Sequence, residues 1–198
     1  MPNHPAQHPD DVYWTDGDSD VPVFQRPKEF AALLAIYERL APARVLEVGS
    51  YFGGTLKQWI RRAPHGVTVV SIDTPVPGAF RPALWRTWAE TATGELIIIA
   101  NQSNDPATVH VANAYAPYDF VFIDADHYYD SVKRDYDLYM PMVRPGGLLA
   151  FHDILEHPTH PEIQVRWLWE EIKRTHLHTF ELVEDRDAPW GGIGGVWL

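Results

Sequence analysis

The chain has 198 residues, 45% of them hydrophobic, which is enough for the core of one domain. Its formal net charge of −11 excludes a broad basic face of the kind that binds nucleic acid, and the absence of cysteine excludes disulfides and cysteine-ligated zinc. No apolar run approaches the ~20 residues of a membrane span, and the amino terminus does not read as a signal peptide. We therefore expect a cytoplasmic protein with neither nucleic acid nor a membrane as partner.

Residues 1–26 are rich in Pro, His and Asp and poor in aliphatic side chains. Such a composition is typical of a flexible or loosely packed arm. Val21, Val23 and Phe24 are among the side chains available to pin this arm down. Residues 27–198 are expected to form a single domain.

Beyond the arm, segments with helical spacing of apolar residues alternate with short, continuously apolar segments. Helices are expected from residue 27 to the proline at 42, over 56–62, through 84–88, and over 106–114, 129–140 and 162–174. Strands are expected over 44–48, 67–72, 96–99, 118–123, 148–151, 180–183 and 194–197.

This alternation predicts an α/β fold: a doubly wound, mostly parallel, seven-stranded Rossmann-like sheet with an antiparallel pair at its carboxyl-terminal end. Ligands bind such sheets outside the carboxyl ends of the strands. The polar residues expected there are Glu47, Gly49, Asp73, 101–104, 124–127, His152 and Asp153.

The first strand ends in a glycine turn, which lets a ligand approach the backbone closely. From Gly49 to Gly54 the pattern is G-x-x-x-G-G, without the middle glycine that lets a dinucleotide pyrophosphate rest on a helix. Glu47 suits a cationic ligand better than a pyrophosphate, and Asp73 ends the second strand, where a carboxylate can bind a ribose diol. The alternative is that Glu47 is a buried structural carboxylate and the glycines only turn the chain.

The order of these pieces resembles the class I S-adenosylmethionine-dependent methyltransferases, over most of the chain from about residue 27. The resemblance lies in Glu47 to Gly49 with Gly53, in Asp73 as ribose-binding acid, and in 145–147 as the turn before the fifth strand. It implies S-adenosylmethionine as cofactor, with 49–53 beside its methionine part and Ser103 near its adenine. The cofactor-binding residues that it implies are Glu47, Gly49, Ser50, Tyr51, Gly53, Thr55, Asp73, Thr74, Ser103 and Asp124.

A second group of polar residues, Asp124-x-x-His127 and His152-Asp153, follows two strands that should be adjacent and therefore face one pocket. The aspartates offer hard oxygen ligands for magnesium, calcium or manganese, and His152 shifts the preference towards a transition metal.

This second group resembles the metal-dependent O-methyltransferases of macrolide sugars and their relatives linked to cephalosporin biosynthesis. The resemblance implies that Asp124 and Asp153 bind a metal, with His152 as a further metal position, and that His127 acts with Asp124 in catalysis as the base for an acceptor hydroxyl. Those enzymes generally have Glu-Asp at His152-Asp153. His152 thus stays open between a ligand and a structural histidine hydrogen-bonded to Asp124.

These features predict methyl transfer to a hydroxyl oxygen of a small or sugar-like molecule in natural-product biosynthesis, with Mg²⁺ or another divalent cation. The acceptor is expected to meet the arm, the loops at 75–82 or 157–161, or a second subunit of a homo-oligomer. His157 and His160 are expected to be exposed loop residues. Two alternatives remain: a non-catalytic binding or assembly module with this fold, and an NAD-dependent oxidoreductase, which the missing glycine and Glu47 disfavour.

Overall fold

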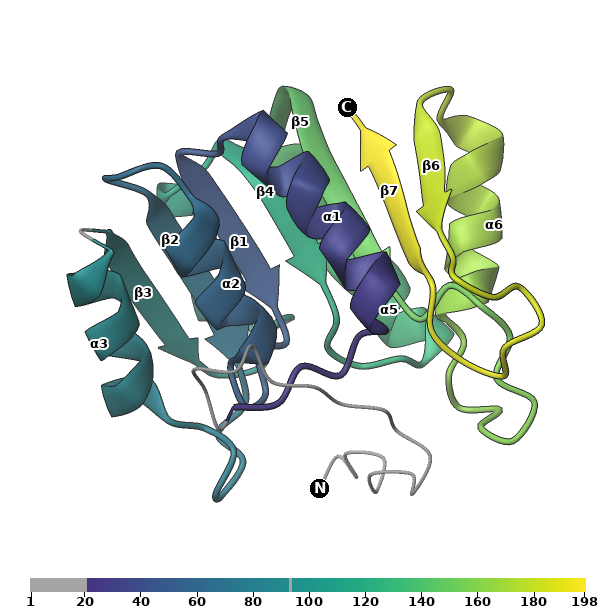
Figure 1. The fold of residues 1–198 in the computed structure, drawn as a ribbon, viewed down its shortest axis with the longest axis horizontal. Coiled ribbons are helices and arrows are strands. Elements are labelled where there is room, and N and C mark those ends of the chain that lie inside the picture. Colours follow the sequence, from purple (N-terminus) through teal and green to yellow (C-terminus); the bar gives the residue numbers. More distant parts are fainter. Residues whose placement is uncertain (1–20, 93) are drawn as a thin grey trace.

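The computed structural model describes residues 21–92 and 94–198. In this part of the chain, seven strands form one sheet in the order β3-β2-β1-β4-β5-β7-β6 (Figure 1). The strands are β1 (Arg44–Val48), β2 (Thr68–Asp73), β3 (Glu95–Ala100), β4 (Tyr118–Ile123), β5 (Val143–His152), β6 (Thr179–Leu182) and β7 (Ile193–Trp197). Strands β1 to β5 pair in parallel, whereas β7 is antiparallel to both of its neighbours. The predicted fold class is confirmed.

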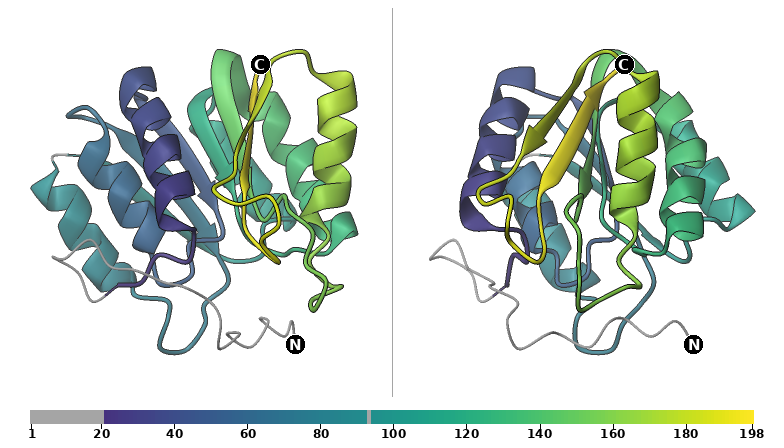
Figure 2. Two further views of the ribbon diagram at one scale, coloured as in Figure 1. Left: turned by 45° about the vertical axis from the view of Figure 1, so that its right-hand side comes forward. Right: turned by 90° about the vertical axis from the view of Figure 1, so that its right-hand side faces the viewer.

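Helices cover both faces of the sheet (Figures 1 and 2). One layer consists of α1 (Pro27–Leu40), α2 (Gly54–Arg62) and α3 (Pro82–Thr91), and the other of α4 (Pro106–Ala114), α5 (Tyr129–Tyr139) and α6 (Val165–Thr175), with a short 3-10 helix, η1 (Met140–Met142), after α5. Because both faces are buried, neighbouring side chains of one strand enter different cores: Val45 packs under α1–α3 and Leu46 under α4–α6. Among the described helices, none has the length and apolar character to cross a membrane.

Two glycines of β7 let aromatic rings lie directly against the strand. A Cβ at Gly194 would lie 2.8 Å from the indole of Trp169 on α6, and one at Gly195 would lie 2.2 Å from the ring of Phe180 on β6. These positions must therefore be glycine for the carboxyl-terminal strands and α6 to pack.

The strand β5 differs from its prediction. It already begins at Val143, so residues 145–147 lie within the strand and do not form a separate turn before it. The pairing of β4 with β5 shifts register between Tyr118 and Phe120, and Gly146 has a φ of +73°. Gly146 and Gly147 therefore lie at a bulge-like irregularity within a longer strand.

Helix α6 begins at Val165, three residues later than the predicted start at 162. Gln164 is engaged by the loop after β4: its backbone N–H donates to the carbonyl of His127 at 2.8 Å, and its side-chain oxygen accepts from the N–H of Tyr129 at 3.0 Å. These tertiary hydrogen bonds hold the segment before α6 outside the helix.

The described part of the predicted arm, residues 21–26, is packed on the domain rather than loose. Val21 and Val23 are each only 2% exposed, and Val23 joins the core under α1–α3. A Cβ at Gly54 would lie 2.0 Å from the carbonyl oxygen of Pro22, so the first residue of α2 must be glycine for this segment to pass. Residues 1–20 lie outside the described residues, and the domain start at residue 27 stays a prediction.

Candidate active site

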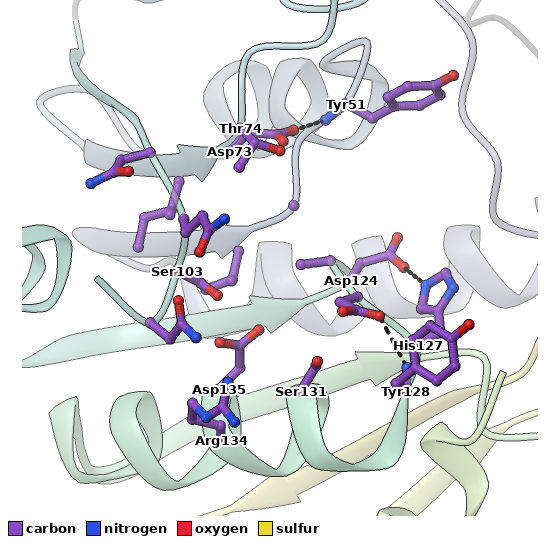
Figure 3. A pocket seen from close by; sticks show the side chains of 18 of the residues that line it. Tyr51, Asp73, Thr74, Ser103, Asp124, His127, Tyr128, Ser131, Arg134 and Asp135 are labelled. Carbon is purple, nitrogen blue, oxygen red and sulfur yellow. Dashed lines mark hydrogen bonds and ion pairs between the residues drawn. The ribbon is translucent and has the colours of Figure 1, made fainter. Parts of the chain in front are cut away.

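The order of the strands reverses between β1 and β4, and α/β sheets bind ligands at such a point. A cavity of about 1070 Å³ opens there, at the carboxyl ends of the parallel strands (Figure 3). The predicted site residues that line it are Gly49, Tyr51, Asp73, Thr74, Ser103, Asp124 and His127. Residues of all four loops after β1 to β4 thus meet in one cavity.

The loop after β1 is held in place by contacts that its sequence alone does not reveal. Gly49 has a φ of +93°, and a Cβ there would lie 2.1 Å from the carbonyl oxygen of Asp124, so the loops after β1 and β4 touch. Tyr51 also has a positive φ, +47°. Asp73 Oδ2 accepts a hydrogen bond from the backbone N–H of Ser50 at 2.9 Å. It also accepts one from the backbone N–H of Tyr51 (Figure 3). The acid after β2 therefore fixes the loop after β1.

Four residues predicted to bind the cofactor do not line the cavity: Glu47, Ser50, Gly53 and Thr55. Glu47 is fully buried and projects from β1 into the α1–α3 layer, where Oε1 accepts from Trp59 Nε1 at 2.7 Å and Oε2 from Ser50 Oγ at 2.5 Å. Gly53, with φ +85°, precedes α2 and faces the indole of Trp85, which a Cβ would meet at 2.5 Å. The geometry agrees with the alternative that Glu47 is a structural carboxylate.

Burial raises the pKa of Glu47 to about 7, and hydrogen bonds from Ser50, Thr55 and Trp59 oppose that rise. Because this value lies above the ordinary 4.5, the contribution of Glu47 to stability is complete below pH 4.5 and is lost as the pH rises through 7. Glu47→Gln cannot ionise. Its free energy of unfolding, relative to wild type, should therefore increase by up to about 3 kcal/mol between about pH 4.5 and pH 8.

Urea unfolding of both proteins across this pH range measures the effect, with Glu90→Gln, which changes an exposed acid on α3, as control. Because Glu47 does not line the cavity, the affinity of Glu47→Gln for the cofactor should stay within about threefold of wild type. Loss of a binding contact worth about 1.4 kcal/mol would instead lower that affinity tenfold. A difference in stability that does not change with pH would contradict this structural role.

The far end of the cavity lies between the loop 101–104 and α5 (Figure 3). Tyr139 Oη donates to the carbonyl of Ser103 at 2.5 Å. Asp135 lines the cavity and is 2% exposed. Burial raises its pKa to about 6, although a hydrogen bond from Ser103 acts to lower that pKa. The sequence pattern does not single out Asp135 as a site residue. The available signal was an acid three residues after Val132, on the core-facing side of the helix.

The predicted acid and histidine residues after β4 and β5 do come together. His127 Nε2 lies 3.4 Å from Asp124 Oδ1 and 3.6 Å from Asp153 Oδ2. His152 Nδ1 lies 3.4 Å from the same two oxygens. Asp153 has a left-handed backbone, with φ +59°. Two carboxylates are thus shared by two imidazoles.

Opposite charges control the protonation of this cluster. Burial would lower the pKa of His152, but the carboxylates of Asp153 and Asp124 outweigh it and raise that pKa to about 9. Burial would likewise raise the pKa of Asp153, but the nearby His152 and His157 hold it well below its usual range. The pKa of His127 is also raised, because Asp124 and Asp153 outweigh its burial.

His157 is buried, in contrast to the exposed loop position predicted for it. It is 7% exposed, its Nε2 lies 3.3 Å from Asp153 Oδ1, and the N–H of Gly191 donates to the same nitrogen at 3.4 Å. The loop after β5 folds back under the 190–192 turn, which the local sequence does not show. His160 is partly exposed and its Nδ1 lies 3.0 Å from Glu162 Oε1.

The cluster has the donor atoms that a divalent cation needs. One atom each from Asp124, His152 and Asp153 lie within 4.8 Å of one another, so a single ion can reach all three. Two carboxylates and an imidazole are ligands common to several divalent metals. His127 lies beside this group, against both carboxylates.

A doubly wound sheet with a glycine turn after β1, an acid after β2 that holds this turn, and a cavity at the reversal of strand order defines a methyltransferase-type, Rossmann-like protein. Residues 46–154, more than half of the chain, match the family model described as a methyltransferase domain, and the chain belongs to that family.

One relative is demethylmacrocin O-methyltransferase of Streptomyces fradiae, 27% identical over 119 residues, which are 56% of this chain and 27% of the relative. The chain thus matches about a quarter of that relative's length. Similar solved structures include the O-methyltransferase of Bacillus cereus in complex with SAH (TM-score 0.68, 18% identity, 91% of this chain and 84% of that one). Another is the MycE methyltransferase of mycinamycin biosynthesis with Mg and SAH (TM-score 0.56, 19% identity, 85% and 48%). At such identities the two structures establish the fold.

Proposed function

We propose that the chain transfers the methyl group of S-adenosylmethionine to a hydroxyl oxygen of a small or sugar-like acceptor, with the help of a divalent cation. The observation that carries this proposal is the position of His127, whose Nε2 lies within 3.6 Å of both Asp124 and Asp153 beside the cavity. Family membership supports the reaction class, and the named relatives, a demethylmacrocin O-methyltransferase among them, support oxygen as the methylated atom.

The cavity offers the cofactor contacts along the ends of β1, β2 and β3. We place the methionine part against Gly49 and Tyr51, the ribose near Asp73 and Thr74, and the adenine near Ser103, all of which line the cavity. The loop at Gly49 touches the backbone of Asp124, so a cofactor held by this loop would lie beside the acid and histidine cluster.

Asp124, His152 and Asp153 are the residues that would hold the cation. A cation bound there would lower the pKa of an acceptor hydroxyl and help to orient it. Because one of the three donors is an imidazole, we expect manganese, iron, cobalt or zinc to bind more tightly than magnesium, which prefers oxygen ligands alone.

His127 supplies the base. Its neutral imidazole accepts the hydroxyl proton, and the carboxylates of Asp124 and Asp153 stabilise the imidazolium that forms. The oxygen forms a bond to the methyl carbon while the carbon–sulfur bond breaks, which leaves the neutral thioether S-adenosylhomocysteine. Much of the rate comes from holding the two substrates in line.

The acceptor and its partners stay predictions. Tyr128, Glu162 and Ile163 line the cavity near the cluster and are the residues that we expect to meet the acceptor. The homo-oligomer and the cytoplasmic location expected from the sequence are part of this proposal.

Calorimetric titration with SAM and SAH, with and without Mn²⁺ or Mg²⁺, tests the cofactor, and SAH release with a panel of methyl glycosides tests the acceptor class. Absence of SAM and SAH binding under all these conditions would favour a non-catalytic module, and binding of NAD instead would favour an oxidoreductase.

Asp73→Ala should raise the Kd for SAH by about 10–100-fold, because it removes a carboxylate that holds the Gly49 loop and faces the expected ribose. Isothermal calorimetry measures this change. Glu95→Ala removes an exposed acid at the other end of the neighbouring strand β3 and should leave the Kd unchanged. An unaltered Kd for Asp73→Ala would place the ribose elsewhere.

A further inference from the structure

The segment of residues 21–26, called the strap here, crosses the edge of the sheet at which the parallel strands end, before it enters α1 (Figures 1 and 2). It is anchored at both ends. The carbonyl of Pro22 lies against Gly54 at the start of α2, and the Arg26 guanidinium lies 4.4 Å above the ring of Trp190 before β7. The strap therefore has a defined path over the site.

The middle of the strap faces the two loops that build the cavity. The ring of Phe24 packs against Tyr51 and Phe52 after β1, with centroid distances of 5.5 and 6.1 Å. The next residue, Gln25, is 2% exposed and reaches the loop after β4, where its Nε2 donates to Asp124 Oδ2 at 2.5 Å. A side chain 99 positions earlier in the chain thus touches the candidate catalytic acid.

This contact divides the two oxygens of Asp124 between different partners. Oδ2 accepts from the amide of Gln25, whereas Oδ1 lies 3.4 Å from His127 Nε2 and 3.4 Å from His152 Nδ1. A primary amide nitrogen donates and does not accept, so it holds one oxygen of the carboxylate and prevents its rotation. The orientation of Oδ1 towards His127 then follows from the anchored strap.

We infer that Gln25 is a positioning residue for methyl transfer: its amide holds the Asp124 carboxylate with Oδ1 towards the histidines, and the strap is therefore part of the active site. This inference rests on the proposed function. Partners that orient metal ligands and catalytic groups typically contribute about 10–100-fold to metal affinity or activity.

The test compares Gln25→Ala, Gln25→Glu and the control Lys28→Ala, which changes an exposed residue in the first turn of α1. Gln25→Ala should weaken calorimetric binding of Mn²⁺, in the presence of SAH, by about 10–100-fold and lower kcat with the best methyl glycoside by a similar factor. The affinity of Gln25→Ala for SAH alone should match that of wild type. Lys28→Ala should match wild type in all of these measurements.

Gln25→Glu gives a measurement that a purely structural role would not change. As a carboxylate, Glu at this position repels Asp124, but as a carboxylic acid it can donate the original hydrogen bond. Relative to wild type, its kcat should recover as the pH falls, whereas the defect of Gln25→Ala should stay the same. Identical pH profiles of the two variants would overturn the inference.

Failure of this inference is distinct from failure of the proposed function. If wild type binds Mn²⁺ and releases SAH, and both Gln25 variants do so equally well, the positioning role alone is overturned. If wild type neither binds Mn²⁺ nor transfers methyl, the proposed function fails and the role of Gln25 falls with it.

Discussion

Replacing His127 with alanine is expected to lower the rate of methyl transfer by about 10³-fold, within the range usual for loss of a general base. His127 Nε2 lies 3.4 Å from Asp124 Oδ1 and 3.6 Å from Asp153 Oδ2, so the two carboxylates stabilise the charge that it gains with the proton. Binding of SAH should be retained, because the proposed cofactor contacts lie in the loops after β1, β2 and β3. Initial rates of SAH release and calorimetry measure the two effects separately.

The pH dependence gives a second measure of this role. Burial lowers the pKa of His127, but Asp124 and Asp153 outweigh burial and raise it above 6.5. Since the base must be neutral to accept a proton, the rate should rise with pH as His127 loses its proton. His110→Ala, a change to an exposed histidine on α4, should leave the rate unchanged. Wild-type activity of His127→Ala would remove His127 from the mechanism.

Asp153→Asn is expected to reduce both divalent-cation affinity and methyl transfer by at least about 100-fold. The Asp153 carboxylate is 3.4 Å from His152 Nδ1, 3.6 Å from His127 Nε2 and 3.3 Å from His157 Nε2. Its negative charge therefore interacts with three imidazoles as well as with the proposed cation. Asparagine tolerates the left-handed backbone at this position as aspartate does, which makes it a better substitution than alanine.

Titration of Asp153→Asn with Mn²⁺ in the presence of SAH separates loss of cation binding from loss of rate. Asp130→Asn, which neutralises an exposed acid in the first turn of α5, is the matched control and should behave as wild type. An Asp153→Asn variant that binds Mn²⁺ with wild-type affinity would exclude Asp153 as a ligand.

The sequence predicted the fold well because both faces of the sheet are buried. Continuous apolar strands between amphipathic helices allow few arrangements other than a parallel, doubly wound sheet. Because helices cover both faces, however, the sequence pattern does not indicate to which face of the sheet a given side chain points. Val45 and Glu47 share the face beneath α2, but with apolar residues on both sides of β1 the pleat cannot be read from the pattern. The pattern therefore favours Glu47 as a cofactor residue, whereas its carboxylate accepts a hydrogen bond from Trp59 Nε1 in the core.

Local patterns also failed where distant segments meet. His157 lies in a proline-broken loop whose composition is typical of exposed chain, and it became buried because the turn at 190–192 lies over it. Gln25 belongs to a segment with the composition of an arm, and only its anchors at Gly54 and Trp190 bring it to Asp124.

By itself, the sequence determined which residues lie at the carboxyl ends of the strands. It thereby also determined that Asp124, His127, His152 and Asp153 lie close together. A parallel sheet brings the carboxyl ends of its strands to one edge, so spacing along the chain becomes proximity in space. Only the tertiary structure decided which partners complete that edge, Gln25 and His157 among them. Their positions depend on contacts between segments far apart in sequence, which no local periodicity records.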